Sequence, residues 1–192
     1  MVENIAITNC VLGSICNAIK FGTASDAGFR NIAISNCVIR RPSQVSTRNW
    51  SEMIPGISND TTVISGIALE IVDGGIMDQV TISNITMTDI QTPLFIKLGT
   101  RKGVGIFKNV VISNIIATDE SLMTSSITGV PGGFIENFII KDVIFNCRGT
   151  AIEEEAWAPV PERNSVGPDN RMFGYSLPAY GFYIRHVKNL QF

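Results

Sequence analysis

The sequence predicts an all-β fold, a right-handed parallel β-helix (a pile of strand-built coils, or rungs) of about five to six rungs with long loops. Two observations predict it: a short segment recurs along the chain, and apolar and polar residues alternate within each copy. The composition agrees, since 45% of the 192 residues are hydrophobic and 17% are charged. Such a chain can bury a sizeable core, whereas a disordered chain has fewer apolar residues.

The repeat is clearest in Asn31–Val38, which reads Asn-Ile-Ala-Ile-Ser-Asn-Cys-Val. Similar segments begin at Asn4, Gln79, Asn109, Asn137 and Asn189. The starts of successive copies are 27, 48, 30, 28 and 52 residues apart. The three short intervals fit one rung each, and the two long ones fit a rung plus an insertion. Insertions that leave a repeat intact behave as loops on one face of the stack.

Each copy is predicted to be a strand with one buried face, because Ile5 and Ile7 point one way while Ala6 and Thr8 point the other. The Asn that follows suits a tight corner, since Asn tolerates the left-handed backbone region. We therefore expect the corner side chains to stack as an amide ladder in which neighbours hydrogen-bond. The ladder is formed by Asn9, Asn36, Asn84 and Asn114, and Asp142 interrupts it in the fifth copy.

A second strand is predicted in each rung from runs rich in β-branched and aromatic residues, at residues 18–22, 67–71, 94–99 and 181–185. Residues 40–63, 118–133 and 153–179 are predicted to be loops, and such loops often carry binding sites. A leucine-rich repeat has a similar period, but it requires a leucine framework and a helical return, and here Ile and Val dominate.

The four cysteines do not have the spacing of a zinc site, and the chain has one histidine, His186. Neither a metal nor another cofactor is expected. Cys10 and Cys37 occupy equivalent positions of successive repeats, which predicts small apolar core residues, with a disulfide between them as the alternative. The net charge of −2 and the absence of a basic stripe argue against a nucleic-acid partner. No apolar run is long enough to span a membrane.

The chain begins and stops inside the repeat pattern, and its N-terminus lacks the basic and apolar regions of a signal peptide. An open terminal rung exposes apolar core and unpaired strand edges. We therefore expect residues 1–192 to be a single β-helix domain that is the internal or C-terminal part of a longer β-helix. End-to-end self-association through the open rungs is the alternative.

Several segments together resemble bacterial members of glycoside hydrolase family 28, the polygalacturonases and rhamnogalacturonan-degrading enzymes with the pectin-lyase-like fold. They cover nearly the whole chain: residues 17–25, 28–37, 66–75, 92–101, 126–132 and 177–186. The resemblance implies a secreted or periplasmic enzyme that acts on pectin-like polysaccharides or oligosaccharides. Its reaction would be inverting hydrolysis, in which two carboxyl groups activate a water and protonate the leaving group.

The resemblance does not extend to the catalytic motifs. The family carries its acids in Asn-Thr-Asp and Asp-Asp motifs followed by Gly-His-Gly, and none of these occurs in this sequence. In the family these motifs precede an Arg-Ile-Lys motif, which Ala18-Ile19-Lys20 matches here. We therefore assign no catalytic residue, expect the acids upstream of residue 1, and expect the chain to be inactive alone.

The Arg-Ile-Lys motif of the family holds a sugar carboxylate, so Lys20 is a candidate substrate-binding residue. Ala18 replaces the Arg, and one ammonium orients a carboxylate less well than a forked guanidinium does, which leaves room for a different sugar. The alternative is that Lys20 is an ordinary solvent-facing strand residue.

Glu70 and Asp73 are further candidates, because two carboxylates near a cleft can perform acid–base chemistry. The alternative is an exposed strand residue followed by a turn Asp before Gly74. Arg101, Arg185 and His186, which lie in resembling segments, complete the candidate substrate-binding residues. Arg185 and His186 are adjacent on an alternating strand, so one should face in and the other out, and a structural role for His186 is the alternative.

Trp157 and Tyr180 are aromatic residues that can stack on sugar rings, although loop aromatics often only anchor the loop. The acidic run at residues 153–155 is predicted to be a solvated corner. Two other functions compete with the hydrolase. One is a non-catalytic carbohydrate-binding or adhesive β-helix. The other is a lyase, which would require a cluster of calcium-binding aspartates that the sequence does not show.

Overall fold

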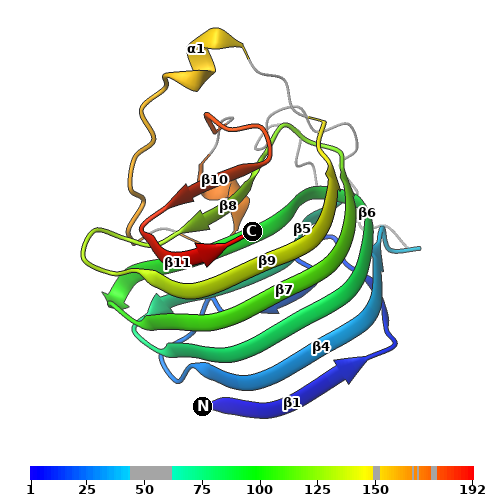
Figure 1. Cartoon of the computed structure of the whole chain (residues 1–192), viewed down its shortest axis with the longest axis horizontal. Coiled ribbons are helices and arrows are strands. Elements are labelled where there is room, and N and C mark those ends of the chain that lie inside the picture. The colour runs from blue at the N-terminus through cyan, green and yellow to red at the C-terminus, as the bar shows by residue number, and fades with distance from the viewer. Residues whose placement is uncertain (44–61, 149–151, 166, 168, 174–176) are drawn as a thin grey trace.

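The computed structural model describes residues 1–43, 62–148, 152–165, 167, 169–173 and 177–192. In these residues the chain is all-β, and eleven strands form one large parallel sheet (Figure 1). The helical elements are the short α1 (Glu153–Ala156) and the 3₁₀ turn η1 (Asn170–Met172). Neither of these helices has the length to cross a membrane.

The first of two ladders in this sheet contains the predicted repeats. Its strands follow the order β1 (Val2–Thr8), β4 (Phe29–Arg40), the first part of β6 (Ile76–Gly103), β7 (Ile106–Asp119), β9 (Ile135–Asn146) and β11 (Val187–Gln191). These strands run as nested curved bands in Figure 1, and the short β2 (Val11–Gly13) pairs with the end of β4. Equivalent residues lie in register across the ladder: Ile5, Ile32, Val80, Val110, Phe138 and Leu190.

The second ladder is formed by β3 (Ile19–Phe21), β5 (Val63–Asp73), the later part of β6, β8 (Ser125–Thr128) and β10 (Phe182–Arg185). Four of its members were predicted from the sequence. The fifth, β8, lies in the stretch 118–133 that was predicted to be a loop, so that prediction is wrong there. Its residues are mostly hydroxyl-bearing, and only Ile127 joins the core, which is why it lacks the usual strand signature. Most of the predicted loop 40–63 lies outside the described residues.

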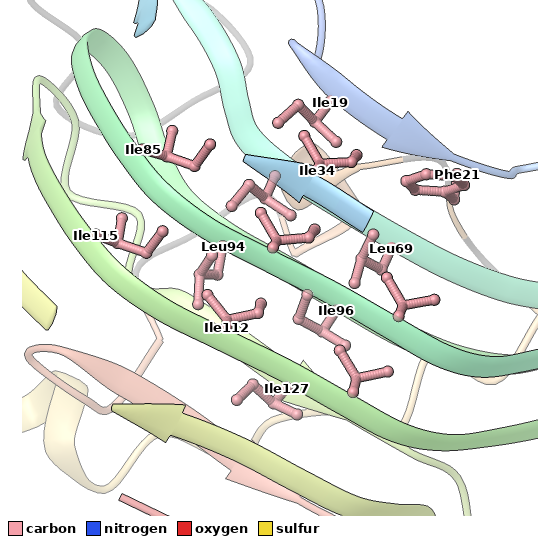
Figure 2. Packing of buried hydrophobic residues seen from close by; sticks show 14 of the residues in the cluster. Ile19, Phe21, Ile34, Leu69, Ile85, Leu94, Ile96, Ile112, Ile115 and Ile127 are labelled. Atoms are coloured by element: carbon pink, nitrogen blue, oxygen red, sulfur yellow. The ribbon is translucent and has the colours of Figure 1, made fainter. Parts of the chain in front are cut away.

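The core fills the space between the two ladders. Figure 2 shows isoleucines of the first ladder, such as Ile112 and Ile115, beside Leu94 and Ile96 of the second. Full burial of one such side chain contributes roughly 1.5–3 kcal/mol. Cys37 is buried in this cluster and Cys10 packs against it. The predicted core role is therefore confirmed, whereas a disulfide is not formed, because all four cysteines are free.

The predicted amide ladder is confirmed at its centre. Asn84 Nδ2 donates to Asn36 Oδ1 at 3.0 Å, and Asn114 Nδ2 donates to Asn84 Oδ1 at 3.0 Å. These residues have φ values of 55°, 56° and 53° for Asn36, Asn84 and Asn114, which is the left-handed region. At its first position Asn36 Nδ2 contacts Thr8 Oγ1 at 3.4 Å, instead of the expected Asn9.

A second row of side-chain hydrogen bonds, which the sequence did not predict, runs along the starts of the repeats in two parts, one on each side of Gln79. Its hydrogen bonds join Asn31 to Asn4 at 2.7 Å, Asn109 to Asp78 at 2.7 Å, and Asn137 to Asn109 and Asn189 to Asn137 at 2.8 Å each. Gln79 takes the equivalent backbone position, with a φ of 57°. Both ends of the repeat segment therefore turn through left-handed residues.

Replacement of Asn84 separates the two contributions of a corner residue. Asn84→Ala loses both amide hydrogen bonds and also places a Cβ in the left-handed region, which costs about 1–2 kcal/mol. Asn84→Gly loses the same hydrogen bonds but adopts this backbone freely. Urea unfolding should show that both variants are less stable than the wild type. The free energy of unfolding of Asn84→Ala should be about 1 kcal/mol lower than that of Asn84→Gly. Equal stability of the two variants would show that the corner conformation is not a constraint.

Candidate functional site

A row of charged side chains lies on the outer face of the second ladder. Glu70 of β5 is in register with Lys97 of β6, Lys97 with Thr128 of β8, and Thr128 with Arg185 of β10. Because side chains alternate along a strand, these four share the face opposite to the core. Lys20 of β3 joins the row from an offset position, since its register partner is Ala68. The sequence repeat itself therefore sets the spacing of the charges.

Glu70 is a fully buried carboxylate whose ion-pair partner is Lys20, with Nζ 2.9 Å from Oε1. The Lys20 side chain remains 25% exposed. The second oxygen, Oε2, has no hydrogen-bond partner among the described residues. Burial raises the pKa of Glu70 to about 7, and the Lys20 ammonium offsets part of that rise. The alternative interpretation of Glu70 as an exposed strand residue is wrong, because the chain covers it.

Lys97 is also fully buried, although the sequence did not single it out. Its ammonium donates to the carbonyl oxygen of Glu162 at 3.4 Å. Burial is the main cause that lowers the pKa of Lys97 to about 8, and the nearby Arg185 guanidinium adds to it. Glu162 and Glu70 act in the opposite direction. Lys97 thus carries a positive charge that its surroundings compensate only in part.

Arg185 and His186 meet the segment that follows α1. Arg185 donates to the carbonyl oxygens of Val160 at 2.9 Å and Pro161 at 2.7 Å, and its Nε lies 3.4 Å from Glu162 Oε2. His186 Nε2 lies 3.1 Å from the same carboxylate oxygen. The prediction that one of the two faces in and the other out is therefore wrong. His186 has a φ of 53°, so the chain turns there and strand alternation ends.

Asp73 and Arg101 form the third charged group. The guanidinium of Arg101 donates two hydrogen bonds, of 2.7 and 2.6 Å, to the two oxygens of Asp73, and the amide of Ser25 donates a third at 3.3 Å. The Arg101 hydrogen bonds hold the pKa of Asp73 below its usual value. Asp73 precedes Gly74, whose φ of 89° confirms the predicted turn. The Arg101 side chain stays 41% exposed.

The six candidate residues therefore fall into three charged groups, two of them on or beside one row. The residues that sequence reasoning missed are Lys97 and Glu162. A signal for Lys97 does exist, because the dipeptide Ile19-Lys20 recurs as Ile96-Lys97 and is matched by a second basic pair, Ile184-Arg185. Nothing similar marks Glu162, which meets the row only through the path of a long loop.

The two aromatic candidates behave differently. Trp157 follows α1 and is 83% exposed. Tyr180 is exposed as well, but its hydroxyl donates to the carbonyl oxygen of Cys147 at 2.9 Å, and its own carbonyl accepts from Thr124. Tyr180 thus anchors its loop. The acidic run at 153–155 forms the exposed first turn of α1, which agrees with a solvated segment.

An open hollow of about 470 Å³ lies elsewhere, across β1, β4, β6 and β7, and its lining includes Ala6, Asn31, Ala33, Thr81 and Asn109. It is neutral and does not reach the charged row. Within the described parts of the chain, no three His, Cys, Asp or Glu side chains lie close enough to hold a metal ion.

Comparisons of the chain with protein-family models, with curated proteins and with solved structures found no match. The resemblance to family 28 accordingly rests on the sequence segments alone.

The pH dependence of stability tests the burial of Glu70. Its pKa rises from 4.5 in the unfolded chain to about 7 in the folded protein. Between these values the folded state binds more protons than the unfolded state, so stability falls as pH rises. The titration of Glu70 therefore lowers the free energy of unfolding by about 3 kcal/mol between pH 4.5 and pH 7.5. In Glu70→Gln, urea unfolding at a series of pH values should lack that decline, so the variant should be more stable than the wild type at pH 8.

The matched control is Glu136→Gln, which removes an exposed carboxylate 4.0 Å from Lys188 and should keep the wild-type pH profile. A Glu70→Gln profile that runs parallel to the wild type would contradict the raised pKa.

Proposed function

We propose that the chain is a right-handed parallel β-helix of the pectin-degrading type, and that it holds an acidic polysaccharide against the outer face of the second ladder. Three features support the β-helix. Both ladders run through β6, every strand pair in them is parallel, and the chain returns to the same ladder after 27 to 52 residues. The segments that resemble family 28 support a pectin-like polysaccharide as the substrate. They also support a secreted or periplasmic location for the protein.

The observation that carries the binding proposal is a pair of partly exposed cations, Lys20 at one end of the row and Arg101 in the Asp73 group close to Glu70. Each is positioned by a buried carboxylate, Glu70 or Asp73. Arg101 of β6 also donates to the carbonyl oxygen of Thr23, two residues after β3, so it reaches across β5 to the segment that follows the strand of Lys20. A cation that is already oriented loses less side-chain entropy when it binds a sugar carboxylate.

The buried carboxylates favour binding without catalysis by this chain. An inverting hydrolase needs an acid and a base that reach the glycosidic bond and a water. Glu70 is buried, and both carboxylate oxygens of Asp73 already accept hydrogen bonds from Arg101 and Ser25. The chain thus supplies the substrate-holding part of a pectin-type glycoside hydrolase. A non-catalytic carbohydrate-binding module is the second candidate, and the same engaged carboxylates favour it.

Calorimetric titration with oligogalacturonates tests the binding site. The wild type should bind, and the affinity should fall with added salt, because carboxylates and cations attract. The double variant Lys20→Met/Glu70→Gln removes the ammonium without leaving a buried carboxylate unpaired. It should bind at least about tenfold more weakly, the loss expected for one charge-assisted hydrogen bond. The control Lys141→Met removes an exposed lysine of β9 and should leave the affinity unchanged.

Equal affinities of the wild type and the double variant would contradict the role of Lys20, and no binding by the wild type would contradict the substrate class. A reducing-end assay on the 192-residue chain with polygalacturonan and rhamnogalacturonan separates binding from hydrolysis. We expect no release of reducing ends. Release that the double variant abolishes would show that the chain hydrolyses its substrate.

A further inference from the structure

Residues 157–165, here named the strap, lie over the far end of the charged row. Three consecutive carbonyl oxygens of the strap, from Val160, Pro161 and Glu162, accept hydrogen bonds from Arg185 and Lys97 at 2.9, 2.7 and 3.4 Å. The backbone of the strap therefore binds Lys97 and Arg185, the two cations that extend the row beyond Lys20 and Glu70.

These carbonyls compensate the cations weakly. Arg185 and Lys97 are close enough for their charges to repel, and a carbonyl offers a partial charge where a carboxylate offers a full one. The Glu162 carboxylate contacts Arg185 and His186 but remains partly exposed. An anionic group that entered beside Lys97 and Arg185 would make stronger hydrogen bonds to both than the strap does.

The strap itself has few apolar anchors. Val160 is partly buried and packs against a small cluster that includes Phe95 and Met172. One further backbone hydrogen bond joins the amide of Thr100 to the carbonyl of Asn164 at 2.7 Å. Trp157 at the start of the strap points into solvent. Segments with so little buried apolar surface open at low free-energy cost.

We propose that the strap is an autoinhibitory cover, which excludes acidic sugars from Lys97 and Arg185 and which, when displaced, opens a second anionic subsite along the same row. The nature of the ligand rests on the proposed function above. The covering role of the strap is independent of that function, because it depends only on contacts within this chain.

The first experiment tests the cover without any ligand. The variant Val160→Ala/Glu162→Gln loosens the strap through two strap residues and leaves the row intact. Acetylation by a water-soluble acyl ester, followed by peptide mass spectrometry, should label Lys97 slowly in the wild type and at least about tenfold faster in this variant. Lys141 should react equally in both. The control Glu154→Gln removes a charge from exposed α1 and should leave Lys97 protected.

The second experiment adds the ligand. The loosened variant should bind hexagalacturonate about tenfold more tightly than the wild type does, while the affinity for digalacturonate, too short to reach beyond Lys20 and Arg101, stays the same. Hydrogen exchange of the strap amides verifies the loosening. Faster exchange with unchanged acetylation of Lys97 would overturn the cover. Faster acetylation with equal hexagalacturonate affinities would overturn the second subsite while the binding proposal stands. If neither oligomer binds either protein, the proposed function fails, and the acetylation result alone decides whether the strap is a cover.

Discussion

The structure depends on a backbone constraint, the left-handed corner that closes each repeat segment. Buried residues are two positions apart along the strand, but across the corner residue, whose φ is near 55°, the spacing from Ile34 to Cys37 is three. The corner thus keeps the side chains on both sides of it pointing into one core. Asn meets this requirement with little strain, and its amide bonds to the equivalent residue of the next strand. The corner therefore fixes both the direction of the chain and the register of the strands it joins.

That register has a consequence for charge. Parallel strands lie roughly 4.8 Å apart, so residues in register form a close row. On the inner face the row is Leu69 with Ile96 and Ile127, which gains from burial. On the outer face it is Glu70 with Lys97, Thr128 and Arg185, which loses hydration where the strap covers Lys97 and Arg185. Buried ion pairs seldom add net stability, so the row is not needed to explain why the chain folds, and we propose that it serves binding.

The sequence was sufficient for the parts of the fold that repeat. Alternation and the recurring Asn predicted the strands of the first ladder and the corner residues, and runs of β-branched and aromatic residues predicted most of the second ladder. The strand at Ser125–Thr128 was missed because tertiary pairing, and not its own composition, makes it a strand. The site was predicted less completely. Lys20, Glu70 and Arg185 lie on the strands that were predicted for the second ladder, but Glu162 reaches Arg185 and His186 across a loop with no periodicity. Burial of Glu70 could not be foreseen for the same reason, since Gly167 of that loop lies against its carboxylate.

We propose that a sugar carboxylate binds between Lys20 and Arg101, where the buried carboxylates of Glu70 and Asp73 orient the two cations. A crystal structure of the chain with a bound oligogalacturonate tests it most directly. We expect a sugar carboxylate within hydrogen-bond distance of Lys20 Nζ and of the Arg101 guanidinium. An oligosaccharide seated in the neutral hollow across β1, β4, β6 and β7, with both cations unoccupied, would contradict it.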